Sequence, residues 1–337
     1  MSVLFAVHPR FADHDAGRGH PERPARLEAV IAGATQTEVA DALVMVEPRR
    51  ATVDELERVH PGRYLGAMER YCASGGGRID DDTGTNDASW DAATLAAGAG
   101  LTAIEGLDRG DGVAAFCAVR PPGHHATSSR AMGFCLVNNV AVSAAALAAR
   151  GERVLIVDFD AHHGNGTQDA FYADPRVFYV SFHEWPLYPG TGRLSERGEG
   201  DGLGTNLNFP LPAGSTGDVY LRGIDHVVAP LVDAFAPTWV LLSAGFDAHR
   251  RDPLAGLSLS AGDFGLITER LCAFAPPGRR LVFLEGGYDL QALADSAAAS
   301  LGALAGIAHR PEAPTSGGPG DEVVDAAHQL WTEAGAL

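Results

Sequence analysis

The sequence predicts an α/β domain with a mainly parallel sheet and helices on both of its faces. Short apolar segments rich in β-branched residues alternate with longer helical patterns along the chain. Polar clusters follow four of these segments, as ligand-binding loops follow strands in open α/β sheets. The 337 residues, 46% of them hydrophobic, suffice for one large core, and no repeat or internal linker divides them.

The first half of the chain alternates between these two patterns up to an apolar segment that begins at Val154. Strands are predicted at residues 3–7, at residues 113–119 and from residue 154. Helices are predicted at residues 26–31, 53–59, 64–71, 89–107 and 135–149. Pro24 suits the first turn of the first helix, because proline is already bent for that position.

The second half continues the alternation. Its strands are predicted at residues 176–182, 238–243 and 280–284, and its helices at residues 219–235, 263–274, 290–307 and 323–331. Residues 311–320 form a connector rich in proline and glycine. We therefore expect one domain at residues 1–309, then a connector and a C-terminal helix at residues 310–337. That helix either docks on the domain or makes a contact between subunits.

Charge and composition exclude several classes of function. The formal net charge of −18 argues against nucleic acids and anionic membranes as partners and is compatible with cationic substrates. All 25 basic residues are arginine, which excludes Schiff-base lysine chemistry and a P-loop. The four cysteines form no CxxC pair, as in a reducing cytoplasm. The N-terminus matches a first strand better than a signal peptide, so we expect a cytoplasmic protein without a membrane span.

The most informative stretch is VLIVDFDAHHGNGTQ, residues 154–168. An apolar strand pattern changes abruptly into acidic residues, histidines and glycines, which a hydrophobic core does not need. Asp160 and His162 lie two residues apart, so on an extended chain their side chains point to one side. A carboxylate beside an imidazole is half of a zinc-type site, although solvated loop residues would show the same letters.

Three further clusters follow predicted strands in the same way. They are PPGHH at residues 121–125, AGFDAH at residues 244–249 and EGGY at residues 285–288. The carboxyl ends of parallel strands share one edge of a sheet, so we expect the four clusters to converge there.

These motifs resemble those of the histone deacetylases of the arginase–deacetylase superfamily, especially class II enzymes and their bacterial relatives. The resemblance covers roughly residues 19–301 and includes GHPERP, PPGHHA, MGFC, NN, DFDAHHGNGTQ, YPGTG, AGFDAHRRDPL and LEGGY. It implies an arginase/deacetylase-like fold and a deacetylase domain at residues 1–309. It further implies that one Zn²⁺ is held by Asp160, His162 and Asp247.

The resemblance also implies the catalytic groups. His124 and His125 match the tandem histidines, and Tyr288 matches the hydroxyl that stabilises the oxyanion. We expect Asp158 to pair with His124 and keep it charged, and Asn165 to pair with His125 and leave it less basic. His125 would then take the proton from water and return it to the leaving amine.

Other positions match residues that contact the substrate or a second ion in this family. Those implied for substrate binding are Asp82, Gly133, Phe134, Tyr188, Leu254 and Gly287. Arg26 matches an arginine of the channel for released acetate. A structural monovalent cation, K⁺, is implied at Asp158, Asp160, His162, Ser181 and Phe182.

Three alternatives remain beside an acyl-lysine hydrolase that acts on peptides or proteins. An arginase-like ureohydrolase would bind two Mn²⁺, but Gly164 and His249 occupy positions where its bridging carboxylates would stand. A non-catalytic binding module would lack Tyr288 or a metal ligand, and both are present. An acetylpolyamine amidohydrolase, which takes an acylated small amine, is the nearest competitor. It is disfavoured because Leu254 cannot pair with a second ammonium group.

Overall fold

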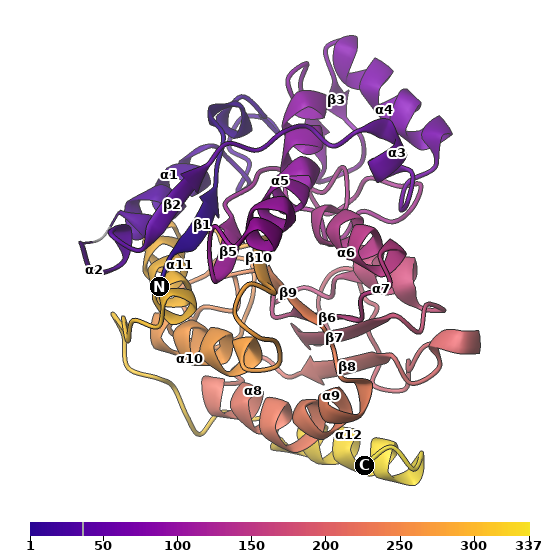
Figure 1. The fold of residues 1–337 in the computed structure, drawn as a ribbon, viewed down its shortest axis with the longest axis vertical. Coiled ribbons are helices and arrows are strands. Elements are labelled where there is room, and N and C mark those ends of the chain that lie inside the picture. The colour runs from indigo at the N-terminus through magenta and orange to yellow at the C-terminus, as the bar shows by residue number, and fades with distance from the viewer. Residues whose placement is uncertain (36) are drawn as a thin grey trace.

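An eight-stranded, entirely parallel sheet runs through the centre of the computed structural model, which describes residues 1–35 and 37–337 (Figure 1). The strands lie in the order β2-β1-β5-β10-β9-β6-β7-β8. Their bounds are β1 Val3–Ala6, β2 Leu43–Val46, β5 Ala114–Cys117, β6 Val154–Asp158, β7 Val177–Glu184, β8 Asn206–Leu211, β9 Trp239–Ala244 and β10 Arg280–Leu284. A separate antiparallel pair is formed by β3 (Gly77–Arg78) and β4 (Gly84–Thr85). The predicted fold class is confirmed.

Helices cover both faces of this sheet. One face is covered by α5 and α6, and the other by α1, α10 and α11 (Figure 1). The helices are α1 Ala25–Ala34, α2 Thr37–Ala40, α3 Val53–Leu56, α4 Gly62–Ala73, α5 Ser89–Arg109, α6 Asn139–Ala149, α7 Asn165–Phe171, α8 Gly217–Gly223, α9 Ala229–Phe235, α10 Ala261–Cys272, α11 Leu290–Ala305 and α12 Asp321–Glu333. Every residue of β6 and β9 is buried, since both faces of these strands are covered.

The sequence patterns missed both edge strands of the sheet. β2 is only four residues long, and its Val44 and Met45 are exposed, so it lacks the pattern of a buried strand. β8 contains Pro210, which cannot donate a hydrogen bond to a neighbouring strand. Proline is tolerated in β8 because that strand has a partner, β7, on one side only.

Several helix boundaries differ from those predicted. The helix predicted at residues 53–59 ends at Leu56, and the one predicted from residue 135 begins at Asn139, after the N-cap Asn138. The helix predicted at residues 219–235 is divided by a π-helical turn at Ile224–Val228. Such turns interrupt the regular hydrogen-bonding ladder without changing the apolar pattern of the sequence, which explains why they escape prediction.

The C-terminal helix docks on the domain. Val324, Ala327 and Trp331 of α12 are buried, and the Trp331 ring centroid lies 6.2 Å from that of Phe178 on β7. The preceding connector is held by Glu312, whose carboxylate accepts hydrogen bonds from His249 and from the Ala261 amide of α10. None of the helices in the described part of the chain combines the length and apolarity needed to cross a bilayer.

Candidate active site

The four polar clusters meet at one edge of the sheet. They follow β5, β10, β9 and β6, which are neighbours in that order. Parallel pairing brings all four carboxyl ends together, and in the register Asp158 of β6 lies opposite Ser243 of β9. Sequence segments more than a hundred residues apart, such as residues 121–125 and 285–288, thereby contribute to one site.

Asp160, His162 and Asp247 form the one group of potential metal ligands found among the described residues. Their ligand atoms all lie within 4.8 Å of one another. Nδ1 of His162 lies 3.1 Å from Oδ1 of Asp160 and 3.0 Å from Oδ2 of Asp247. Two buried carboxylates and one imidazole nitrogen suit Zn²⁺, which commonly takes three protein ligands and keeps its fourth position open. The donor set therefore fits the metal that the resemblance implies.

Glycine is required beside these carboxylates. A Cβ atom at Gly286 would lie 2.1 Å from Oδ2 of Asp247 and 2.6 Å from Oδ2 of Asp160. The Gly286 amide also donates to Asp160 Oδ2 at 2.8 Å, so the backbone itself orients that ligand. A Cβ at Gly245 would lie 1.9 Å from the same oxygen. The spacing of these candidate ligands thus depends on close backbone approach from two loops.

The two histidines that follow β5 are buried and differ in their partners. Nδ1 of His124 lies 3.0 Å from Asp158 Oδ2, whereas Nδ1 of His125 lies 2.9 Å from Asn165 Oδ1. Burial lowers the pKa of His124, but the nearby Asp160 and Asp158 carboxylates outweigh it and raise that pKa to about 10. Burial, together with the neighbouring His124 and His162 rings, holds the pKa of His125 well below its usual range.

Tyr288 is held from two sides. Its backbone amide donates to Asp252 Oδ2 at 2.6 Å, and the Arg26 guanidinium carbon lies 4.9 Å from the centroid of its ring. Arg26 is fully buried and donates to the backbone carbonyls of Glu285 and Gly287. Burial raises the pKa of the Tyr288 hydroxyl well above its ordinary value.

A narrow cavity of about 190 Å³ leads to these groups. Its lining comprises Asp82, Pro122, His124, His125, Gly133, Phe134, His162, Leu187, Tyr188, Leu254, Gly286 and Tyr288. Gly133 packs so closely on His125 that a Cβ would lie 2.3 Å from the ring. Of the residues predicted to bind substrate, only Gly287 is not in the lining, and it contacts Arg26 through its carbonyl.

The residues suggested for a monovalent cation lie at or just after the end of β6 and within the neighbouring strand β7. Asp158 and Ser181 are opposite one another in the register, and Phe182 follows Ser181. The ring of Tyr220 stacks on Phe182, with centroids 5.0 Å apart. Its buried hydroxyl has no hydrogen-bond partner among the described residues, an orphaned polar group beside the implied site.

Sequence patterns missed other residues that build the site. Glu285 is fully buried and accepts hydrogen bonds from the amides of Gly123 and His124, which fixes the backbone of the histidine pair. Asp252 fixes Tyr288, as described above. Glu285 and Asp252 belong to the LEGGY and AGFDAHRRDPL motifs, but only their contacts in the structure reveal which backbone segments they fix. Pro122 and Leu187 also line the cavity, but their apolar side chains have no functional group that would mark them in the sequence.

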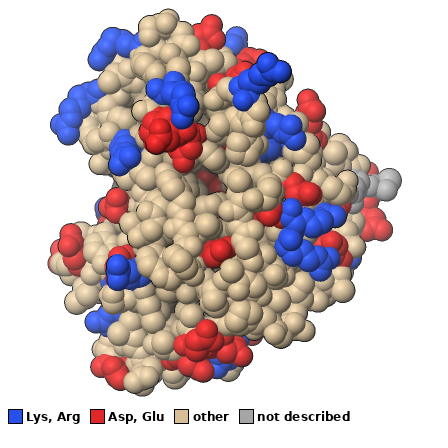
Figure 2. Space-filling view, turned by 180° about the vertical axis from the view of Figure 1, so that it is seen from behind, with Lys and Arg blue, Asp and Glu red and all other residues tan. Residues whose placement is uncertain are grey.

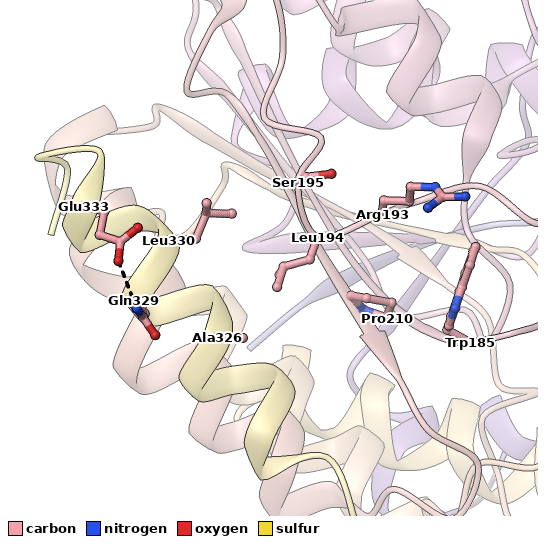
Figure 3. Close-up of a pocket in the computed structure, with 9 residues that line it drawn as sticks. All are labelled: Trp185, Arg193, Leu194, Ser195, Pro210, Ala326, Gln329, Leu330 and Glu333. Carbon is pink, nitrogen blue, oxygen red and sulfur yellow. Dashed lines mark hydrogen bonds between the residues drawn. The ribbon is translucent and has the colours of Figure 1, made fainter.

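A second and larger hollow, of about 500 Å³, is an open groove between α12 and the chain around β8 (Figure 3). Ala326, Gln329, Leu330 and Glu333 of α12 face Trp185, Arg193, Leu194, Ser195 and Pro210. The groove contains no histidine, cysteine or aspartate, so it offers none of the chemistry found in the smaller cavity.

Replacing Gly286 with alanine tests the close packing around the metal ligands. The added methyl would displace Asp160 and Asp247, so we expect Gly286→Ala to lower affinity for Zn²⁺ by at least about tenfold while the chain stays folded. Gly265→Ala in α10 is the matched control, because its Cβ would meet nothing closer than 3.4 Å. Competition with a chromogenic chelator measures the affinity, and equal affinity in both variants would contradict the packing argument.

Comparison with known proteins agrees with this geometry. The family model for the histone deacetylase domain matches residues 20–304. A probable deacetylase of Archaeoglobus fulgidus is 37% identical over 297 residues, covering 86% of this chain and 82% of that protein. Histone deacetylase 10, chloroplastic, of Oryza sativa is 38% identical over 327 residues, covering 90% and 73%.

A solved structure shows the same fold. The crystal structure of the HDA15 HD domain matches with a TM-score of 0.90 and 36% identity, covering 98% of this chain and 95% of that one. The family match and these relatives together place the chain among hydrolases of amide bonds. The chain belongs to the histone deacetylase family.

Proposed function

We propose that this protein hydrolyses the acyl amide of acyl-lysine, most simply acetyl-lysine, in peptides or proteins, with one Zn²⁺ per chain. The observation that carries the proposal is the narrow cavity of about 190 Å³, which joins His124, His125, His162 and Tyr288 to apolar walls. An aliphatic lysine stem fits such walls, and its amide would reach the polar end. Division into a catalytic domain at residues 1–309 and a connector with helix at residues 310–337 is part of the proposal.

The metal belongs at Asp160, His162 and Asp247, whose donor atoms lie within 4.8 Å of one another. When bound there, Zn²⁺ supplies a Lewis acid that polarises the substrate carbonyl and lowers the pKa of water towards neutrality. The backbone amides of Gly286 and Ala161 keep the two carboxylates oriented, since they donate to Asp160 and Asp247 respectively.

His125 is assigned as the general base and later the general acid. The Asn165 side-chain oxygen can only accept, so Nδ1 of His125 carries a proton and Nε2 keeps its lone pair in the neutral ring. A ring with a depressed pKa is neutral at pH 7 and able to take a proton. His124 is the charged neighbour, held by Asp158.

Tyr288 is assigned to the developing oxyanion. Its hydroxyl is protonated at neutral pH, as that of an ordinary tyrosine is, and it lines the same cavity as the two histidines. A donor that is strongest towards a negative oxygen stabilises the transition state more than the substrate. Arg26, which stacks on the Tyr288 ring, is assigned to the path of the released carboxylate.

The walls and mouth of the cavity decide the substrate class. Gly133, Phe134 and Tyr188 form walls, while Asp82 is assigned to grip the backbone amides on either side of the acyl-lysine. Leu254 lines the same cavity and offers no charge to a second ammonium group. The acidic run at residues 80–82 would also attract a polyamine, so an acetylpolyamine amidohydrolase is the second candidate.

A structural K⁺ is assigned to the end of β6 and the adjacent part of β7. Asp158, Asp160, His162, Ser181 and Phe182 are the residues concerned. The buried, unpartnered Tyr220 hydroxyl beside Phe182 supports an additional group there. On the face seen in Figure 2, small groups of arginines lie beside acidic residues and form no continuous basic patch of the kind that nucleic-acid binders carry.

One set of assays tests the proposed function. We expect the purified protein with Zn²⁺ to hydrolyse acetyl-lysine peptides faster than acetylated polyamines, and not to hydrolyse arginine. Elemental analysis should find one transition-metal ion per chain, and chelation should abolish turnover. Two Mn²⁺ per chain with release of urea from arginine would instead support an arginase-like enzyme.

The role of Tyr288 predicts a selective loss of turnover. Tyr288→Phe keeps the ring against Arg26 but removes the donor, so kcat should fall about 10²–10³-fold, the usual cost of losing one oxyanion donor. Metal content and affinity for a hydroxamate should change much less. Steady-state kinetics on one acetyl-lysine peptide measure both constants, and a raised KM with kcat preserved would mean that Tyr288 only binds substrate.

Position 254 predicts a shift between the two substrate classes. Leu254→Glu places a carboxylate in the cavity, so it should raise kcat/KM for acetylspermidine relative to an acetyl-lysine peptide by about tenfold. Leu254→Gln is the matched control, because it adds polarity without charge. A ratio that stays the same in both variants would show that position 254 does not face the distal ammonium group.

A further inference from the structure

We propose that His20 and Thr83 are positioning residues that hold Asp82 at the mouth of the cavity and thereby determine affinity for substrates with a peptide backbone. The inference rests on the proposed function and adds two residues to its specificity. Sequence patterns assign neither residue a role, although His20 belongs to the GHPERP motif and Thr83 follows the acidic run at residues 80–82. Their contacts connect three segments that are far apart in the chain.

His20 joins the first loop to the rim. Its Nε2 lies 2.8 Å from the backbone carbonyl oxygen of Asp82, 62 residues away, and its Nδ1 lies 3.0 Å from the Glu22 amide. A carbonyl only accepts, so Nε2 donates the proton and, in the neutral ring, Nδ1 accepts from Glu22. The ring also meets the Phe134 wall edge-on, with centroids 4.6 Å apart.

The loop that carries His20 is anchored in the core. The Glu22 carboxylate is fully buried and accepts two hydrogen bonds from Arg120, at 2.5 Å and 2.7 Å, and one from Arg26 at 3.1 Å. A buried carboxylate paired with two guanidinium groups is costly to displace, because its charge would lose its partners. His20 is therefore held by the core, and its hydrogen bond fixes the backbone of Asp82.

Thr83 fixes the side chain of Asp82 rather than its backbone. The Thr83 hydroxyl donates to Asp82 Oδ1 at 3.0 Å and accepts from the Phe134 amide at 3.2 Å. Phe134 has a positive φ of 68°, a conformation that costs energy in a non-glycine residue and needs support from its surroundings. One buried hydroxyl thus ties the orientation of the rim carboxylate to the position of the cavity wall.

The consequence concerns substrate binding and not the chemical step. Oδ1 of Asp82 accepts from Thr83, and the Asp82 carboxyl group also shares a hydrogen bond with the neighbouring Asp80 side chain. A carboxylate has more acceptor positions than these two contacts use, so it can still accept from backbone amides of a peptide. His20 lies outside the set of residues that line the cavity, so it acts on the substrate through Asp82, whose backbone carbonyl it holds. Loss of either positioning residue should weaken peptide binding while leaving the catalytic groups in place.

The test uses the zinc-loaded full chain and separates KM from kcat. His20→Phe keeps a ring against Phe134 but removes the donor, and Thr83→Val removes the hydroxyl. Each should raise KM for an acetyl-lysine peptide about tenfold, with kcat changed less than about twofold. His20→Gln, whose amide can replace the Nε2 donor, and Thr83→Ser should restore KM to within about twofold of the parent value. Inhibition by hexanohydroxamic acid, which has no peptide backbone, should be the same in all variants.

Repeating both substitutions in an Asp82→Ala background shows whether they act through that residue. There they should have little further effect on KM, because the group that they position is gone. Equal increases in both backgrounds, or parallel weakening of the hydroxamate, would overturn the inference. So would a KM that is indifferent to both substitutions in a parent that hydrolyses the peptide normally. Absence of peptide hydrolysis by the parent would overturn the proposed function itself.

Discussion

The site depends on the burial of like charges at the edge of one sheet. Asp158, Asp160, Asp247 and Glu285 follow or end three neighbouring strands, and each is fully buried. Burying a carboxylate away from water costs free energy unless cations or hydrogen-bond donors surround it. The Gly123 amide donates a hydrogen bond to Glu285, although burial still raises the pKa of this carboxyl group to about 7. The His124 ring lies between Asp158 and Asp160. Asp160 and Asp247 both contact His162, and a divalent cation held by these three residues would neutralise the two carboxylates. Metal binding and folding should therefore support each other here.

Much of this arrangement could be predicted from the sequence because it depends on local patterns. β6 and β9 are apolar, and the polar residues begin where each strand ends, so the shared edge follows from parallel pairing alone. The edge strands β2 and β8 could not be predicted in that way. A strand with one neighbour needs neither a continuous apolar pattern nor a full set of amide donors, and Pro210 illustrates the second point.

Within the site, residue types that bring their own chemistry were predictable, and residues that act through others were not. An aspartate and a histidine two residues apart after an apolar strand pattern predict a pair of metal ligands from the residue types alone. Glu285 and Asp252, by contrast, contribute hydrogen bonds to backbone amides of distant segments, and any acceptor of suitable length could do so. His20 and Thr83 are similar cases. Each of these residues matters because it joins two segments that are distant in the chain, and a single sequence does not show which segments lie together.

Position 249 shows how the same fold can accommodate one metal rather than two. In the arginase-like alternative a bridging carboxylate would stand there, two residues after Asp247. Here the His249 ring is buried, and its Nδ1 accepts from the Arg251 amide while its Nε2 lies 2.8 Å from Glu312. Both ring nitrogens are therefore engaged, and neither has a lone pair to offer a second ion. Glu312 in turn accepts from the first amide of α10, so the position supports the C-terminal connector instead of a metal. The hydrogen bonds of this one imidazole thus leave position 249 without a donor for a second ion.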